Sequence, residues 1–242
     1  MPLSTRALPI LSDNYAWLLR AEAAGAVAIV DPADADACIE AIETEGGRLD
    51  LILLTHHHDD HIAGTDAVRQ RFGAKVVGAA ADRHRLPRLD QEVKEGDIVR
   101  LGECMLEVIE TPGHTRGHIS FFCPQDDVLI CADTLFSLGC GRLIEGTPAE
   151  MFDSLRKLAR LPGDTLVCCG HEYTQSNARF ALHVDPGNDA LRRRAAEVDR
   201  LRAEGKATVP SRLADELAEN PFLRAPDVAT LADIRKQKDN FR

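Results

Sequence analysis

The sequence of 242 residues has no long apolar run. No stretch approaches the ~18 apolar residues that a membrane-spanning helix needs. The first residues, Met-Pro-Leu-Ser-Thr-Arg, lack the apolar segment of a signal peptide. We therefore expect no membrane partner and no export, which leaves the cytoplasm as the expected location.

The sequence also lacks the C-x-x-C pairs that thiolate zinc sites use. Its seven cysteines are odd in number, scattered, and lie mostly in apolar runs. This distribution excludes a disulfide framework and indicates reduced, buried thiols, as expected in the cytoplasm.

Basic residues are fewer than acidic ones, 29 against 39, which gives a net charge of −10. A general nucleic-acid partner is therefore not expected, because phosphate contact needs a positive surface. The charge is uneven, however. Residues 189–242 hold 12 basic and 10 acidic residues, whereas residues 1–188 hold 17 and 29. We expect that an anionic small molecule would bind most easily at the C-terminal end of the chain.

No internal repeat or low-complexity tract occurs, and the apolar fraction of 44% is that of a globular protein. Strands and helices alternate up to about residue 169, and the rest reads as helices only. This order predicts a layered α/β body and an α-helical C-terminal piece, with a junction near residues 165–175. The predicted strands are 15–19, 27–30, 51–54, 75–78, 97–101, 105–110, 119–123, 128–131 and 165–169. The predicted helices are 34–45, 66–72, 147–159, 174–184, 189–204, 212–218 and 228–238.

One stretch, Thr-His-His-His-Asp-Asp-His at 55–61, carries most of the chemistry. It follows the wholly apolar run 51–54, which reads as a strand buried on both faces. Three imidazoles and a carboxylate in the pattern H-x-H-x-D-H are ligands for a divalent metal. If the stretch is extended, His57 and Asp59 point away from these ligands and lie behind them or in solvent. Asp31, after another apolar strand, is expected to hydrogen-bond this loop from behind.

Three more strand-like runs lead to residues of metal-binding type, His114, Asp133 and His171. If these strands share sheets, the loops that follow them can lie on one edge. Seven ligands suffice for two metal ions about 3.5–4 Å apart with one bridging carboxylate. His84, His118 and His183 have no partners in the sequence and are expected to be structural or exposed.

These motifs resemble the metallo-β-lactamase superfamily and, within it, the glyoxalase II or hydroxyacylglutathione hydrolase family. Besides the metal motif, the resemblance rests on D-N-Y (13–15), T-P-G-H-T (111–115), D-T-L-F (133–136), G-C-G-R (139–142), E-G-T (145–147), G-H-E-Y-T (170–174) and R-K-Q-K-D-N-F (235–241). It implies an αββα sandwich with the metals at one edge. It also implies two domains, a metal hydrolase domain at 1–170 and a glutathione-binding α-helical domain at 171–242.

The resemblance further implies how the ligands divide between two ions. The first ion would take His56, His58 and His114. The second would take Asp60, His61 and His171, and Asp133 would bridge both. Zinc is the expected metal and iron or manganese are alternatives, because the mixed His/Asp set suits all three.

Substrate contacts are implied at positions where this family binds glutathione. The residues at these positions are Arg142, Ile144, Tyr173, Asn177, Arg235 and Lys238. Cations among them suit the two carboxylates of glutathione. Two positions depart from the family pattern: Ile144 stands where an aromatic residue is usual, and Ala63 where glycine is common.

The expected activity is hydrolysis of S-D-lactoylglutathione to glutathione and D-lactate, the second step of methylglyoxal detoxification. Two divalent ions would supply a bridging hydroxide at neutral pH, which attacks the thioester carbonyl. Asp133 and Asp60 are the catalytic carboxylates, with Asp60 able to orient the hydroxide. We expect a monomer whose partner is its small-molecule substrate.

Other activities of the superfamily remain as alternatives. A persulfide dioxygenase would carry one iron and consume oxygen, and a lactonase or β-lactamase would not need the C-terminal cations. A tRNA-processing nuclease would need a basic arm, which residues 1–188 do not offer. A non-catalytic binding module would be expected to have lost metal ligands, and none is replaced.

Overall fold

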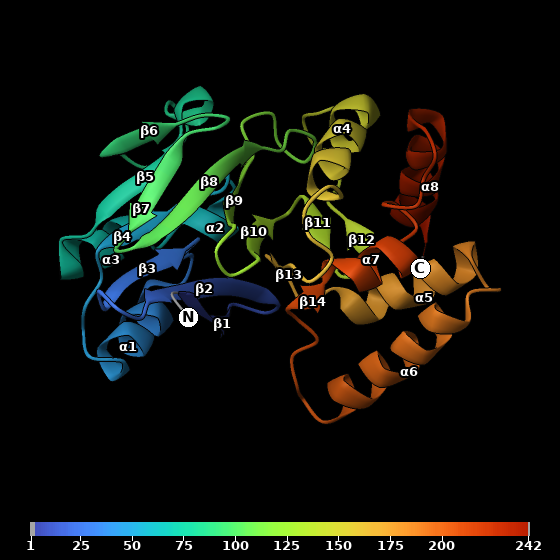
Figure 1. Cartoon of the computed structure of the whole chain (residues 1–242), viewed down its shortest axis with the longest axis horizontal. Helices are drawn as coiled ribbons and strands as arrows, with labels where there is room; N and C mark the ends of the chain where they lie inside the picture. The colour runs from blue at the N-terminus through green and yellow to red at the C-terminus, as the bar shows by residue number, and fades with distance from the viewer. Residues whose placement is uncertain (1–2, 242) are drawn as a thin grey trace. The chain divides into compact units, whose positions relative to one another are not determined.

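The computed structural model describes residues 3–241 and contains two six-stranded sheets and a small hairpin. The first sheet has the order β1-β2-β3-β4-β5-β6, and the second has the order β14-β13-β10-β9-β8-β7 (Figure 1). The strands are β1 (Leu3–Ile10), β2 (Asn14–Ala21), β3 (Ala26–Val30), β4 (Leu51–Leu53), β5 (Lys75–Ala79), β6 (Gln91–Val93), β7 (Ile98–Leu101), β8 (Cys104–Glu110), β9 (Ile119–Cys123), β10 (Val128–Ala132), β11 (Leu135–Phe136), β12 (Gly139–Cys140), β13 (Leu166–Cys169) and β14 (Ser211–Arg212).

The helices are α1 (Ala35–Thr44), α2 (Asp59–Ile62), α3 (Thr65–Phe72), η1 (Ala80–Asp82, a 3₁₀ helix), α4 (Pro148–Leu158), α5 (Thr174–Val184), α6 (Asp189–Ala203), α7 (Leu213–Glu219) and α8 (Val228–Asn240). Among the described residues, no helix is both long and apolar enough to cross a membrane. The chain forms two compact units. The first comprises the chain up to Glu110 with Gly117–Ile130, and the second comprises Thr111–Arg116 with the chain from Cys131 onward.

The first unit is built on the apolar alternation of its central strands. One set of alternate side chains packs against α1 and α3, because a strand turns successive residues to opposite faces. This core cluster contains Leu18, Val27, Ile29, Ile52 and Val76 from the sheet, Cys38 and Ile42 from α1, and Val68 from α3. The other set, including Leu19, Ala28 and Leu53, is equally buried. Both faces of the sheet are therefore covered, as the wholly apolar strand 51–54 predicts.

The strand β4 lies inside the first sheet and pairs in parallel with β3 and β5. Its carboxyl end delivers the chain to Thr55, where the metal-ligand stretch begins. The carbonyl of Thr55 accepts a hydrogen bond of 3.0 Å from the backbone of Ile119, the first residue of β9. The stretch is thus held from both sheets of this unit.

In the second unit, the helices hold the short β11–β12 hairpin. Leu138, at its turn, has a φ of 59°, a left-handed conformation that costs energy for a branched side chain. Its N–H donates to Glu216 of α7 at 2.8 Å. Asn220 donates to the carbonyls of Phe136 and Gly139 at 3.2 and 3.0 Å. Side chains from the C-terminal part of the chain therefore hold a turn that lies about 80 residues earlier.

Each predicted strand and helix is present, with ends that differ by a few residues at most. The prediction that only helices follow residue 169 is wrong, because β14 pairs with β13 at the edge of the second sheet. The strand β6 lies in a part of the chain for which the sequence predicts neither a strand nor a helix. The strand β1 and the hairpin β11–β12 were not predicted from the sequence. The domain boundary at residue 170 stays a prediction. It comes from the family resemblance, whereas the two units described above are defined by their compactness.

Candidate metal centre

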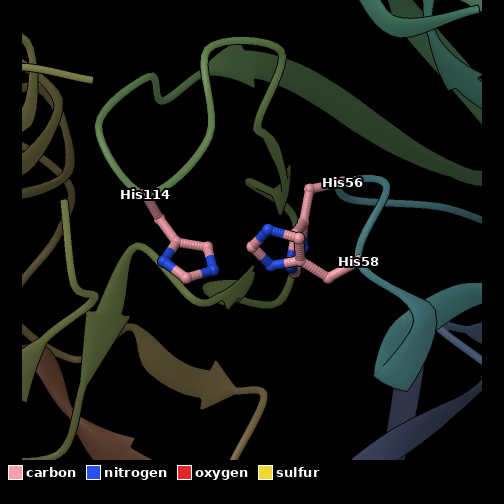
Figure 2. Close-up of side chains that lie close together, drawn as sticks. All are labelled: His56, His58 and His114. Atoms are coloured by element: carbon pink, nitrogen blue, oxygen red, sulfur yellow. The ribbon is translucent and has the colours of Figure 1, made fainter. Parts of the chain in front are cut away.

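The loop after β4 gathers its imidazoles closely. His56 and His61 are buried, and His58 is half-buried. His56 Nε2 lies 3.2 Å from His58 Nδ1, and the two rings meet edge to face. Figure 2 shows these two rings on their loop, and it also draws His114, which belongs to the second unit. Imidazole nitrogens brought this close together are typical of ligands to a shared ion.

The stretch is extended only up to His58, because the four-residue helix α2 begins at Asp59. Asp59 is exposed, as expected. His57 instead lies against the segment that follows β5. Its Nδ1 is 3.3 Å from Asp82 Oδ2, and its Nε2 is 3.2 Å from an Arg85 nitrogen. Arg85 also pairs with the buried Asp82 at 2.6 Å, so His57 ties the metal loop to η1.

Asp31 hydrogen-bonds the metal loop from behind, as predicted. Its Oδ1 accepts from the Thr55 N–H at 2.9 Å, and its Oδ2 accepts from the Thr55 hydroxyl at 2.6 Å. The same Oδ2 lies 3.0 Å from His61 Nδ1. Asp31, His56 and His61 each offer an atom within 4.8 Å of the others, which is close enough to hold an ion. Because Thr55 and His61 already occupy the Asp31 carboxylate, we interpret this group as an orienting contact.

The second unit holds three candidate ligands around one carboxylate. His114 Nε2 and His171 Nε2 each lie 3.4 Å from Asp133 Oδ2. All three residues are at least 94% buried. The sequence spreads them over 58 positions, and the ends of β8, β10 and β13 bring them together. Asp133 is therefore central to this half of the site, as a bridging carboxylate has to be.

Backbone contacts fix the orientation of His114. Its Nδ1 lies 2.9 Å from the carbonyl of Arg142, so Nδ1 carries the proton and Nε2 is the nitrogen that would bind a metal. Gly113 precedes it with a φ of 150°, and a side chain there would lie 2.9 Å from Met151 of α4. Glycine is required at this position both by the conformation and by the close packing.

His171 lies in an aromatic environment. Its ring is stacked on Tyr173 with centroids 4.6 Å apart and an angle of 7°, and Phe136 approaches both rings edge-on. Tyr173 remains 37% exposed. It thus combines a packed ring with access to solvent, and its phenol hydroxyl is a polar group suited to a bound molecule.

The predicted substrate residues differ widely in exposure. Arg142, Ile144 and Tyr173 are exposed, Lys238 is half-buried, and Arg235 and Asn177 are buried. Arg235 donates to the Cys140 carbonyl at 2.9 Å and pairs with Asp239 at 2.8 Å. Asn177 donates to the Ser137 carbonyl at 3.0 Å. These last two side chains hold the β11–β12 hairpin in place.

The Lys238 amine has an unusual environment for a cation. It donates to the Ser176 carbonyl at 3.0 Å and lies 5.4 Å from the centre of the Phe180 ring. Burial, and after it the positive charges of Arg235 and Arg142, together lower its pKa to about 8. A bound anion would relieve this repulsion, so the environment favours an anionic ligand here.

The cysteines are free and buried, as predicted. Burial raises the pKa of Cys169 to about 12 and that of Cys168 well above its ordinary value. These thiols stay protonated at neutral pH and are not nucleophiles. Their position beside His171 therefore reflects packing.

Two residues of the site escaped prediction from the sequence. His118 is fully buried and stacks on the His56 ring, with centroids 4.8 Å apart. A structural role agrees with the prediction, but the contact with the metal loop was not predicted. Asn14 donates from Nδ2 to the carboxylate of Asp60 at 3.1 Å. The motif Asp-Asn-Tyr at 13–15 was the only sign of Asn14 in the sequence, and a motif does not show which residue Asn14 contacts.

Comparison with known proteins places this arrangement in a family. The model of the metallo-β-lactamase superfamily matches residues 11–171, and the model of the hydroxyacylglutathione hydrolase C-terminus matches residues 172–241. A hydroxyacylglutathione hydrolase of Acidiphilium cryptum is 58% identical over 234 residues, which cover 97% of this chain and 95% of the relative. The chain belongs to the hydroxyacylglutathione hydrolase family. The resemblance predicted from the motifs is thereby confirmed.

Solved structures agree on the fold of the family. ETHE1 from Myxococcus xanthus superposes with a TM-score of 0.73 at 26% identity, covering 96% of this chain and 90% of that one. TTHA1623, solved in a di-iron-bound form, has a TM-score of 0.59 at 27% identity over 69% of this chain and 91% of its own. The predicted class, a metallo-β-lactamase-type α/β fold with a helical C-terminal region, is confirmed.

Proposed function

We propose that this protein hydrolyses S-D-lactoylglutathione, and related 2-hydroxyacylglutathiones, to glutathione and the free hydroxy acid. The observation that carries the proposal is the joint match of a metal hydrolase region and a hydroxyacylglutathione hydrolase C-terminus along one chain. Full-length relatives of the same name support it. The chain is accordingly a thioester hydrolase of this family.

The proposed metal site joins the two sets of ligands described above. One divalent ion would be held by His56, His58 and His114, and a second by Asp60, His61 and His171, with Asp133 as a ligand to both. The donor set fits such ions, because every donor is an imidazole nitrogen or a carboxylate oxygen. We propose zinc, with iron or manganese as alternatives. When bound, the ions lower the pKa of water and polarise a carbonyl oxygen.

The chain's own residues prepare this chemistry. Asp31 and the Arg142 carbonyl accept from Nδ1 of His61 and His114, which leaves Nε2 of each ring as the metal-binding nitrogen. Asp133 stands between His114 and His171 and is the proposed bridging ligand. Asp60 is half-exposed, with 47% of its side chain accessible. We assign it the added role of orienting the attacking water toward the thioester carbonyl.

Substrate selection is assigned to the cations of the second unit. Arg142 and Lys238 are the proposed partners of the glutathione carboxylates, supported by the pKa of Lys238, which burial and then the charges of Arg235 and Arg142 lower. Tyr173 offers its hydroxyl to the peptide part. Arg235 and Asn177 act by holding the β11–β12 hairpin that leads to these groups. Ile144, 59% exposed, gives an aliphatic contact where relatives are expected to have an aromatic one.

The remaining assignments are part of the same proposal. The metal hydrolase domain spans 1–170 and the glutathione-binding domain spans 171–242. The protein acts as a monomer in the cytoplasm. Seven buried, free cysteines support a reducing compartment.

The proposal is tested by following thiol release from S-D-lactoylglutathione with purified, metal-replete protein and an oxygen electrode in the same cell. We expect rapid release of thiol and unchanged oxygen, with activity lost after chelation and restored by added zinc. Oxygen consumption without thioester cleavage would instead indicate a persulfide dioxygenase. Cleavage of lactones or β-lactams alone would equally contradict the proposal.

A further inference from the structure

The β1–β2 hairpin holds a buried amide against the metal loop. Asn14 is the first residue of β2 and pairs with Ile10, the last residue of β1, so the hairpin fixes its backbone. Its side chain is buried, with 5% of the residue exposed. An amide at this depth needs hydrogen-bond partners, and two of them belong to Asp60.

Asn14 contacts both the backbone and the side chain of Asp60. Its Nδ2 donates to the Asp60 carbonyl at 3.0 Å and to Asp60 Oδ2 at 3.1 Å. Both partners are acceptors, so only the nitrogen of the amide, and not its oxygen, can face them. One side chain therefore fixes the position of the Asp60 main chain and the rotation of its carboxylate.

Asp60 needs this support because its own helix gives little. The helix α2 has four residues, and its N-cap residue, His58, makes no side-chain capping bond. Nearly half of the Asp60 side chain is exposed, so packing leaves its carboxylate room to rotate. A carboxylate has about four lone-pair sites, and one bond from Asn14 leaves capacity for a cation.

We propose that Asn14 is a positioning residue that presents the Asp60 carboxylate to the second divalent ion. The inference rests on the metal site proposed above and goes beyond it, because Asn14 is not itself a ligand. Removing a hydrogen-bond partner of a metal ligand typically weakens metal binding about 10–100-fold. We expect a loss in this range for the ion held by Asp60, and little change for the other ion.

The test compares zinc retention in the wild type, Asn14→Ala, Asn14→Leu and Ser12→Ala. Each protein is loaded with zinc and dialysed against graded concentrations of chelator, and the zinc left per chain is measured. Leucine keeps the branching of asparagine at Cγ but has no donor. Both Asn14 variants should lose their more weakly held ion at a chelator concentration that is lower, by about 10-fold or more, than the concentration the wild type requires. Ser12→Ala, at an exposed position of the same hairpin, should match the wild type.

The melting temperatures of the zinc-free proteins separate positioning from folding. We expect zinc-free Asn14→Leu to melt close to the wild type although it loses zinc early. Wild-type zinc retention in both Asn14 variants would overturn the inference. So would normal retention in Asn14→Leu beside a loss in Asn14→Ala, since that pattern indicates packing. No substrate is used, so a wild type that holds zinc but cleaves no thioester would contradict the proposed function and leave this result intact.

Discussion

At the scale of single residues, the site depends on which nitrogen of each imidazole the protein occupies. His61 and His114 both use Nδ1 for a protein contact, with the Asp31 carboxylate and the Arg142 carbonyl respectively. His56 Nδ1 lies 3.0 Å from the Thr55 hydroxyl. Because these contacts fix ring orientation and tautomer, they matter for metal binding nearly as much as the ligands do.

Replacing Asp31 by asparagine tests this role. The variant keeps the shape of the side chain but loses the charge that accepts from Thr55 and His61. We expect metal affinity to fall about 10–100-fold, measured by chelator competition. Asp36→Asn, at an exposed position in α1, is the matched control. Equal affinities in Asp31→Asn and the wild type would contradict the orienting role.

Asp60→Asn separates ligation from catalysis. If Asp60 also orients the attacking water, kcat should fall by more than the metal content does, by roughly 100-fold or more from loss of an acid–base group. The measurement is kcat per bound metal, with metal analysis on the same sample. Proportional losses of metal and rate would reduce Asp60 to a simple ligand.

Lys238 predicts an alkaline limit to substrate capture. Its pKa is lowered to about 8, so the amine is charged below that pH and becomes neutral as the pH rises through it. A charged hydrogen bond to a carboxylate is worth about 1.5–3 kcal/mol, so kcat/KM should follow the charged fraction of Lys238 and fall roughly 10-fold between pH 7 and 9. Lys238→Met should have a low kcat/KM that does not change between pH 7 and 9.

Lys236→Met is the control for this profile, because Lys236 is exposed and lies on the same helix. It should retain the wild-type profile. A wild-type kcat/KM that is flat between pH 7 and 9 would show that Lys238 does not bind the substrate.

The sequence predicts the metal ligands better than it predicts the residues that contact these ligands and hold them in place. The pattern H-x-H-x-D-H identifies metal ligands because few other functions require that density of imidazoles. Asn14, Asp82 and His118 carry no comparable pattern, and their partners lie 25 to 62 residues away. Such contacts depend on how the strands pair, which composition and spacing do not determine. Asp31 was predictable because it also ends a strongly apolar strand.

At the scale of elements, hydrophobic periodicity predicted the long helices and central strands. The helix α4 is the clearest case, with a capping box between Thr147 and Glu150 and a buried stripe of Met151, Leu155 and Leu158. The elements it missed are short or lie at an edge. β1 mixes polar and apolar residues at the edge of its sheet, and β14 has two residues. Tertiary pairing creates these strands, so local sequence gives them little signal.

The network of α6 and α7 provides a prediction about stability. Glu216 is fully buried and pairs with Arg194, which also contacts Glu219 at 3.0 Å. Arg194→Met leaves the buried carboxylate of Glu216 without its cation, which should lower the free energy of unfolding by about 3–5 kcal/mol. Denaturant unfolding of the zinc-loaded protein measures this.

Two further variants make the test specific. Arg193→Met, exposed on the same helix, should change the free energy of unfolding by less than about 0.5 kcal/mol. Adding Glu216→Leu to Arg194→Met should recover part of the loss, because a buried pair can be replaced by apolar groups. If Arg194→Met is as stable as Arg193→Met, the network does not support the fold.

At the scale of the whole molecule, the chain divides its tasks along the sequence. Residues 1–188 carry the excess of acidic charge and the proposed metal ligands, whereas residues 189–242 carry a small excess of basic charge and Lys238. The family matches follow the same order, with the metal hydrolase region before the hydroxyacylglutathione hydrolase C-terminus. In the proposed function, the metal ligands therefore all lie in residues 1–188, whereas the substrate contacts come from both parts, Arg142 and Tyr173 from the first and Lys238 from the second.

The proposed function depends on two divalent ions per chain that support thioester hydrolysis. The most direct measurement is a titration of metal-free protein with zinc while thiol release from S-D-lactoylglutathione is followed. We predict that activity rises to a plateau at two equivalents of zinc per chain. A plateau at one equivalent, or no thiol release at any zinc concentration, would contradict the proposed function.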